Sequence, residues 1–366
     1  MPFLSLSPVN FRNLLNKPMD LLSKEVYFTG ENGQGKSNLL EALYYSSYAS
    51  SFRTHTDSEL IKNGEKSMSL RTIYREENGN VHTTFIVIEN GHKKIEKDGK
   101  IIHDRKELIN TMPCVLYSHD DLDFAEGSPE RRRFFLDQSL SMYDVMYIDV
   151  LRRYRRILKN RNLCLKEKKY ELFDTYDIQL IMNGLEIQKK RKDAVFQFNQ
   201  IFEKMYENVS GIAGVNIRYL PSWKSQDEAS LPNIDEIMEL VKSKRDVERS
   251  LGTTMTGPHR DRIVFIKDGV QFIPTASTGQ RRLVALVLRT AQAVFYTQVT
   301  GKNRFFLWTT FFWSLTRKKE RGLLQCFLIM TSFSAPFFPG SLMKTTGMRQ
   351  PEFTKLKTVH GRNQNE

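Results

Sequence analysis

The sequence predicts an α/β fold that a helical insertion interrupts. A glycine-rich loop stands between an apolar strand and a helix in residues 1–60. Residues 69–102 have the β-rich, turn-separated pattern of antiparallel strands, whereas residues 129–245 show the three- and four-residue apolar spacing of helices. Strand and helix signals return in residues 251–302. We therefore expect a head domain that is built from both sides of the insertion.

The glycine-rich loop matches the phosphate-loop pattern G-x-x-x-x-G-K-[ST]. Its residues, with the asparagine that follows, are Gly30, Glu31, Asn32, Gly33, Gln34, Gly35, Lys36, Ser37 and Asn38. In such a loop, backbone N–H groups and the positive end of the next helix face nucleotide phosphates. Lys36 is expected to reach the β- and γ-phosphates, and the Ser37 hydroxyl is expected to bind Mg²⁺. The loop therefore predicts a site for ATP and Mg²⁺.

The segments around the loop predict the elements that hold it. Val26–Phe28 is expected to form the preceding strand, and a helix is expected from Ser37. Residues 263–266 and 270–273 predict a hairpin, followed by a helix from Arg281. Residues 129–245 show almost no strand signal, so this block is expected to be a helical arm.

A second motif, Ser277-Thr278-Gly279-Gln280, stands directly before the helix that is expected from Arg281. Alone, this pattern is weak evidence for a phosphate site, because it is more often a plain helix cap. Together with the phosphate loop, Ser277, Gly279 and Gln280 resemble the signature motif of ABC-type ATPases. That resemblance implies that two copies close around two ATP molecules, each copy presenting its signature motif to the nucleotide of the other.

Composition indicates a soluble chain with a polyanionic partner. The formal net charge is +13, but residues 303–366 contribute ten Lys/Arg against three acidic residues, so 45 Lys/Arg against 39 Asp/Glu remain in residues 1–302. The charge therefore supports nucleic-acid binding only weakly. No apolar run is long enough to span a membrane, and the N-terminus lacks the pattern of a secretory signal, so we expect a cytoplasmic location. Cys114, Cys164 and Cys326 lack metal-ligand spacing and are expected to be reduced thiols.

Several further strings, in matching order and spacing, resemble the RecF family of ABC-type ATPases. Besides the phosphate loop and residues 277–280, they are Asn10–Asn13, Asn38–Ala42, Ser51–Thr54, Gly127–Asp137 and Gly257–Asp261. The resemblance implies an ATPase head with an antiparallel β subdomain (residues 1–128 and 246–302) and an inserted helical arm (residues 129–245).

The same resemblance implies a role in DNA gap repair, replication-fork recovery and the response to DNA damage. It implies an ATP-dependent homodimer on gapped or junction DNA, a weak DNA-dependent ATPase activity, and cooperation with the RecO and RecR mediators in loading recombinase at single-strand gaps. No membrane partner is expected.

Basic residues supply the candidate DNA contacts. Arg12 and Arg53 flank the phosphate loop in sequence and are candidates for phosphate contact with DNA or ATP. Two arginine clusters are candidates for neutralising DNA phosphates. The first consists of Arg131, Arg132 and Arg133, and the second consists of Arg152, Arg153, Arg155 and Arg156. Charge runs on helices are often merely solvated, and both interpretations stay open at the level of the sequence. His259 is a structural or a functional residue with equal plausibility.

The catalytic carboxylates that the family implies are missing. The family pattern is an aliphatic strand, an Asp-Asp pair and a Leu-Asp-Pro string about 30 residues after the signature motif, where the carboxylates orient Mg²⁺ and the attacking water. At the position of the pair the chain has Thr309 and Thr310. Residues 303–366 contain no Asp and no Tyr.

A change of reading frame accounts for this loss. With suitable codons for residues 302–319, restoring one A in an A-rich run near Lys302 and Asn303 yields a frame that reads KKPLFFVDDVFLELDPEK. The codons of Trp308 and Thr309 force the first Asp of that string. We therefore predict that residues 303–366 are an out-of-frame tail. The head is then expected to lack a central strand and to expose the aromatic side chains of Phe305, Phe306, Phe311, Phe312 and Trp313 in part.

Two other functions remain open at this point. One is an ABC ATPase subunit of a membrane transporter, which the long insertion and the RecF-like strings argue against. The other is a non-hydrolysing DNA-binding scaffold, which follows if the tail is genuine. Hydrolysis by the chain as it stands is therefore left undecided.

Overall fold

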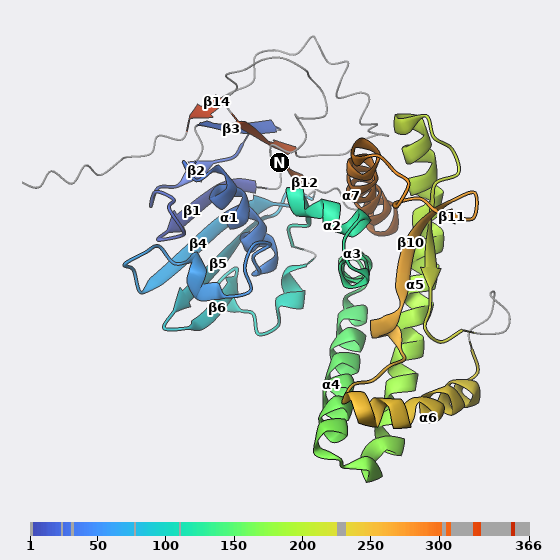
Figure 1. Ribbon diagram of the computed structural model, residues 1–366. Coiled ribbons are helices and arrows are strands. Elements are labelled where there is room, and N and C mark those ends of the chain that lie inside the picture. Colours follow the sequence, from blue (N-terminus) through green and yellow to red (C-terminus); the bar gives the residue numbers. More distant parts are fainter. Residues whose placement is uncertain are drawn as a thin grey trace, which may run out of the picture. The chain divides into compact units, whose positions relative to one another are not determined.

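The computed structural model describes residues 3–22, 25–30, 33–76, 78–109, 111–224, 232–301, 305–308, 325–330 and 353–355. The chain divides into two compact units, which are described one at a time (Figure 1). The first holds residues 1–119 and 301–366, and the second holds residues 120–300. The second unit includes residues 246–300, which we had expected in the head, because α7 (Thr278–Thr300) packs on α5 (Phe173–Ser210) and α2 (Leu122–Ala125).

The first unit contains a six-stranded antiparallel sheet in the order β2-β1-β4-β5-β6-β7. Its strands are β1 (Phe3–Val9), β2 (Met19–Asp20), β4 (Ser67–Arg75), β5 (Val81–Glu89), β6 (His92–Lys97) and β7 (Lys100–Ile101). Alternate residues of β4 and β5 are buried, and they form one apolar core with α1 (Lys36–Tyr48), which Figure 1 shows in blue. The strands predicted for residues 69–102 are confirmed.

A second sheet of the first unit carries the phosphate loop. It has the order β14-β3-β13-β12-β8, with β3 (Glu25–Gly30), β8 (Cys114–Tyr117), β12 (Phe305–Trp308), β13 (Gln325–Met330) and β14 (Phe353–Lys355). Strand β3 confirms the strand predicted at Val26–Phe28. Strand β12 runs parallel to β8, and β13 runs antiparallel to both β12 and β3.

Strand β12 corrects one expectation about the tail. We expected the head to lack this strand, but Phe305–Trp308 pairs with β8, and Phe306 and Leu307 are 3% and 0% exposed. A buried strand requires only a short run of apolar, β-prone side chains. Such a run can therefore form the strand whichever reading frame encodes it. Phe311, Phe312 and Trp313 lie outside the described residues.

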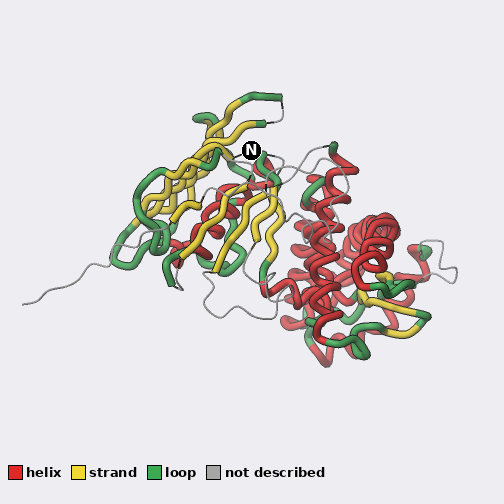
Figure 2. The backbone as a smooth tube through the Cα atoms, turned by 90° about the horizontal axis from the view of Figure 1, so that it is seen from above, coloured by secondary structure: helices red, strands yellow, loops and turns green. Residues whose placement is uncertain are grey.

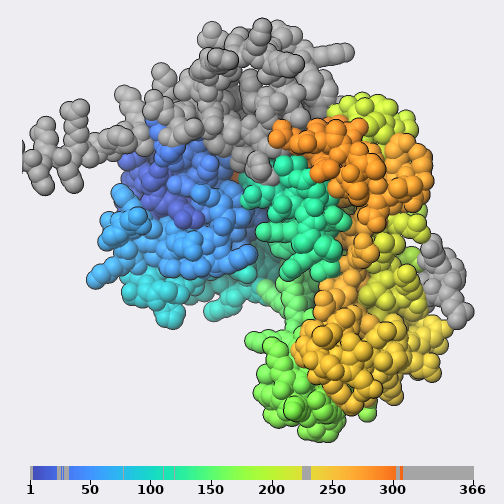
Figure 3. All heavy atoms as spheres, viewed as in Figure 1, coloured from blue at the N-terminus to red at the C-terminus, as the bar shows by residue number. Residues whose placement is uncertain are grey.

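The second unit is mainly helical. After α2 its helices are α3 (Pro129–Ser141), α4 (Val145–Glu167), α5, α6 (Ile234–Leu251) and α7. Ser128 caps α3 by accepting a hydrogen bond from the Arg131 N–H, and Asn233 and Glu236 form a capping box on α6. Helices α4 and α5 lie side by side as a long pair, and α6 crosses them near one end (Figure 1; green and gold in Figure 3). Figure 2, in which helices are red, shows how far helices outweigh strands in this unit.

One strand that the sequence did not indicate, β9 (Asn216–Leu220), lies within the predicted helical arm of residues 129–245. This strand pairs with β10 (Arg262–Lys267), which forms a hairpin with β11 (Val270–Gln271). The hairpin was predicted, although its second strand ends two residues earlier than expected. Strand β9 was missed because its partner β10 lies more than 40 residues away in sequence, beyond the end of the insertion. The helix expected from Arg281 begins at Thr278 as α7.

Cys114 and Cys164 are buried free thiols, as predicted, and the side chain of Cys326 lies outside the described residues. Among the residues that the structure describes, no helix has the length and apolar character needed to cross a membrane. The same residues contain no cluster of His, Cys, Asp and Glu that could hold a metal ion.

Candidate nucleotide-binding site

The phosphate loop joins β3 to α1, as predicted. Gly33 and Gly35 have φ angles of 83° and 98°, in the left-handed region that favours glycine. A Cβ on Gly33 would meet no atom within 4 Å, so the backbone conformation alone requires glycine there. At Gly35 a Cβ would lie 2.7 Å from Oδ1 of Asn13, so this position also lacks space for a side chain. Gly30 ends β3, and Glu31 and Asn32 lie outside the described residues.

Lys36 and Ser37 begin the helix that follows the loop. Lys36 is only 4% exposed, and this burial lowers the pKa of its ammonium group. Ser37 is exposed, and Gly35 is the N-cap, so no capping side chain competes for the first N–H groups of α1. The donors at this helix end are thus an ammonium, a hydroxyl and backbone N–H groups. That donor set fits nucleotide phosphates with Mg²⁺ at the Ser37 hydroxyl.

A buried carboxylate holds both arginines that flank the loop. Glu41 of α1 is fully buried, and the Nε and Nη2 atoms of Arg12 each lie 3.0 Å from its oxygens. Nη1 of Arg53 lies 3.2 Å from the same carboxylate, and the Ser51 hydroxyl donates to it at 2.5 Å. Sequence reasoning missed Glu41, although its position one helical turn after Ser37 was a usable signal. DNA contact by Arg12 and Arg53 stays a prediction.

The strand directions bring the carboxyl ends of three strands to one sheet edge. Strands β3 and β12 are both antiparallel to β13, so they run parallel to each other and to β8. Their carboxyl ends therefore lie at the same edge, which is where ligands bind in parallel sheets. The phosphate loop follows β3 there, and Thr309 and Thr310 follow β12 in sequence. Both threonines lie outside the described residues, so their role stays a prediction.

The signature-like motif lies at the N-terminus of α7 in the second unit. The Ser277 hydroxyl accepts from the Gln280 N–H at 3.3 Å, and Oε1 of Gln280 accepts from the Ser277 N–H at 2.7 Å. This reciprocal pair is a capping box. Ser277 and Gly279 are exposed, and a Cβ on Gly279 would meet only Ser277 Oγ, at 4.0 Å. The motif is thus a rigid, accessible helix end, and its contact with ATP stays a prediction.

The three arginines at the start of α3 differ in their surroundings. Arg132 donates to the carbonyl oxygens of Ile263 and Gly127, and Arg133 donates to the carbonyl oxygen of Asp261. Arg131 is the most exposed, with 59% of its side chain accessible and a long ion pair to Asp123. Arg132 and Arg133 therefore tie α3 to β10 and the turn before it, while Arg131 retains the exposure that a DNA contact needs.

The RecF-like string at residues 257–261 forms a structural junction of the second unit. Arg191 of α5 is 3% exposed and donates to Asp137 of α3, to Asp261 and to the carbonyl oxygen of Pro258, at 2.7 to 3.0 Å. Asp261 also accepts from Gln188, from the Tyr219 hydroxyl and from the Ser222 N–H. These contacts join elements that are distant in sequence, so a structural role in the fold accounts for the residues of this string.

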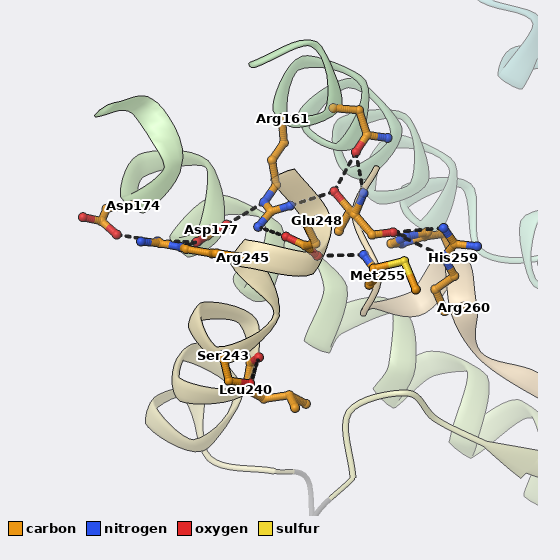
Figure 4. Close-up of polar contacts among 12 residues, drawn as sticks. Arg161, Asp174, Asp177, Leu240, Ser243, Arg245, Glu248, Met255, His259 and Arg260 are labelled. Atoms are coloured by element: carbon orange, nitrogen blue, oxygen red, sulfur yellow. Dashed lines mark hydrogen bonds and ion pairs between the residues drawn. The ribbon is translucent and has the colours of Figure 1, made fainter. Parts of the chain in front are cut away.

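A second buried ion cluster ties α4, α5 and α6 together (Figure 4). Arg161 of α4 is fully buried, and its guanidinium lies 2.6 Å from Asp177 and 2.7 Å from Glu248. Arg245 of α6 reaches Asp177 at 2.6 Å and Asp174 at 2.5 Å. The cluster fixes the crossing of α6 over the α4–α5 pair.

His259 has a structural role in the junction formed by residues 257–261. Its Nε2 lies 3.1 Å from the carbonyl oxygen of Thr254, which can only accept, so Nε2 carries the proton and Nδ1 accepts from the Tyr154 hydroxyl at 2.8 Å. Burial, with Arg260 and Arg133 nearby, lowers the pKa of His259 to about 4, and Asp261 opposes the shift.

The His259 pKa predicts a stability change in mild acid. The unfolded chain binds this proton near pH 6.5 and the folded chain only near 4. His259 therefore contributes stability above pH 6.5 that is lost as the pH falls to 4, about 3 kcal/mol in total. Chemical unfolding of wild type and His259→Gln between pH 7 and 4 should show this difference, with His103→Gln, which replaces an exposed histidine, as control. Parallel curves for wild type and His259→Gln would contradict it.

Comparison with known proteins identifies the family to which this chain belongs. It is 43% identical to the DNA replication and repair protein RecF of Treponema pallidum over 344 residues, which cover 93% of this chain and 96% of the relative. The chain belongs to the RecF family. The RecF protein of Clostridium perfringens is 31% identical over 81% of this chain and 82% of its own length. No family model matches this chain.

Solved structures agree with the RecF assignment. A structure of the recombination mediator protein RecF with ATP, in the RecFOR pathway, superposes with a TM-score of 0.78 and 27% identity, covering 83% of each chain. A second RecF structure, with ATPrS, gives the same TM-score over 84% of this chain. The predicted ABC-type ATPase head with a helical arm is therefore confirmed as the fold of this RecF-family chain.

The similarity to the Treponema pallidum RecF protein extends past residue 302, because it covers 93% of this chain. The out-of-frame hypothesis for residues 303–366 stays a prediction. It requires that the identity within the matched part of the tail is no higher than chance. Alignment of the two underlying DNA sequences across this segment is the corresponding check.

Proposed function

We propose that this chain binds MgATP at its phosphate loop and uses the nucleotide to control its binding to DNA in replication and recombinational repair. The observation that carries the proposal is the donor set of Lys36, Ser37 and the N-terminus of α1 in a member of the RecF family. The RecF–ATP structure supports it, since that protein shares the fold over 83% of this chain.

The finer features of the proposal follow from the family resemblance. Two copies close around ATP, and Ser277, Gly279 and Gln280 of one copy face the phosphate loop of the other. The dimer acts at gapped or junction DNA with the RecO and RecR mediators and helps load recombinase. Family membership sets aside the transporter alternative. A non-hydrolysing DNA-binding scaffold remains the second candidate, because Thr309 and Thr310 stand where carboxylates are expected.

A basic ridge on α4 supports the DNA-binding part of the proposal. The ridge comprises Arg152, Arg155, Arg156, Lys159 and Lys166, which are all exposed and recur at helical spacing. No acidic residue occurs in the sequence between Asp149 and Glu167. Within the described part of the chain, Arg155, Arg156 and Lys159 have no ion-pair partner, although Arg152 pairs with Asp149. We propose that the ridge, together with Arg131, contacts DNA phosphates, and that Arg12, Arg53, Arg132 and Arg133 contribute less.

Neutralising the ridge is expected to weaken DNA binding in a salt-dependent manner. Each phosphate contact contributes about 0.9 to the slope of log K against log salt concentration. The variant Arg155→Gln/Arg156→Gln/Lys159→Gln should therefore reduce that slope by about 2 to 3 on duplex DNA. Its matched control is Lys204→Gln/Lys242→Gln/Lys244→Gln, which removes three exposed lysines from α5 and α6. Equal slopes for the two variants would contradict a DNA contact at the ridge.

A further inference from the structure

The outer side of the phosphate loop is held by a chain of side-chain hydrogen bonds within the first unit. Nδ2 of Asn13 donates to the carbonyl oxygen of Gly33 at 3.0 Å, and Oδ1 of Asn13 accepts from Nδ2 of Asn38 at 2.8 Å. Oδ1 of Asn38 accepts from Nη1 of Arg53 at 2.6 Å. Arg53 in turn is bound by the buried Glu41. The loop carbonyl is thus connected, through two amides and a guanidinium, to a buried carboxylate.

The direction of this chain is fixed by chemistry. A guanidinium can only donate, so Asn38 must turn its oxygen toward Arg53 and its NH₂ toward Asn13. Asn13 must then accept with its oxygen, which leaves its own NH₂ for the carbonyl of Gly33. Each amide orientation follows from the one before it. Arg53, anchored by Glu41, therefore determines which end of Asn13 faces the loop.

The bond at Gly33 has a consequence for the nucleotide side of the loop. The peptide between Gly33 and Gln34 is trans, so the Gly33 carbonyl and the Gln34 N–H point in opposite directions. Asn13, itself bound to Asn38 of α1, draws the carbonyl toward the protein. The Gln34 N–H then points to the other side, where backbone donors of a phosphate loop meet phosphate oxygens.

We propose that Asn13 is a positioning residue for nucleotide binding, which orients the Gln34 N–H toward the phosphates, and that Asn38, Arg53 and Glu41 set the orientation of Asn13. The proposal rests on the proposed function, because it assumes that the loop binds MgATP. It also explains why Gly35 has no room for a Cβ: the Asn13 oxygen occupies that space, at 2.7 Å.

The test compares MgATP affinity in variants of the full chain. Asn13→Ala should weaken binding roughly five- to tenfold, the fold-change expected for one hydrogen bond. The matched control is Asn16→Ala, in the same segment, because among the residues that the structure describes the Asn16 side chain bonds only to Asn10. Asn38→Leu leaves Arg53 on Glu41 but frees the Asn13 amide to rotate, so it should weaken binding by a smaller factor. The double variant Asn13→Ala/Asn38→Leu should bind like Asn13→Ala alone, since both changes act along one path.

A local readout separates positioning from general destabilisation. At saturating MgATP, hydrogen exchange at the Gln34 amide should be slowed in wild type and in Asn16→Ala, but not in Asn13→Ala. The proposal would be overturned if Asn13→Ala kept wild-type MgATP affinity and wild-type protection of the Gln34 amide, or if the losses of affinity were additive in the double variant. A wild-type chain that binds no MgATP would instead overturn the proposed function.

Discussion

Replacing Arg191 by leucine is expected to destabilise the second unit by about 3–5 kcal/mol, the cost of breaking a buried ion pair by removing one partner. Arg191 is 3% exposed and lies between Asp137 and Asp261, which are themselves buried. The substitution leaves two carboxylates in the interior without their cation. Burial by itself lowers the pKa of Arg191, but Asp137, together with Tyr147 and Tyr219, raises it well above its usual value, so the guanidinium is charged at all working pH values.

Chemical unfolding of the full chain, monitored by the loss of helix in the second unit, measures this change in unfolding free energy. Lys189→Leu, on the exposed side of the same helix, is the matched control and should change the unfolding free energy by less than about 0.5 kcal/mol. Adding Asp137→Asn and Asp261→Asn to Arg191→Leu should recover part of the loss, because the buried charges disappear. An Arg191→Leu chain within about 1 kcal/mol of wild type would show that the junction is not held by this residue.

Restoring the reading frame is expected to raise ATP hydrolysis by about 100-fold or more, the lower range for positioned acid–base groups. One added A near codons 302 and 303 places an Asp-Asp pair where Thr309 and Thr310 now stand. Those positions directly follow β12 in sequence, and the carboxyl end of β12 lies at the sheet edge that carries the phosphate loop. A threonine hydroxyl cannot accept a proton from the attacking water as a carboxylate can.

Phosphate release by the two full-length chains, at saturating MgATP, measures this difference. Both chains should bind MgATP, because the Lys36 and Ser37 donors are unchanged, and Lys36→Ala in the restored chain should abolish the gained activity. Equal rates for both chains would refute the assignment of the carboxylates. Sequencing genomic DNA across codons 300–320 decides separately whether the shift is present in the gene.

The phosphate loop could be predicted from sequence because all its parts are local. A strand, three glycines, the Lys-Ser pair and a helix follow one another within residues 26–43, and each has its own pattern. The helical arm and the antiparallel sheet were predictable for the same reason, since apolar spacing reports local structure.

Features that depend on distant partners could not be predicted. Arg12 and Arg53 look like surface cations in sequence, yet both bind Glu41, which is 29 residues from Arg12. Strand β9 forms only because β10 lies beside it, and Asp261 acquires its role from Arg191, 70 residues away. Long-range pairing of this kind leaves no periodic trace in a single sequence.

The most direct test of the central claim is equilibrium DNA binding by the full chain with and without MgATP, in wild type and in Lys36→Ala. If bound nucleotide controls DNA binding, MgATP should strengthen the wild-type affinity by about tenfold, within the usual range of coupling between two sites, and should leave Lys36→Ala unchanged. Wild-type DNA affinity that does not respond to MgATP, or an equal response in Lys36→Ala, would contradict the account.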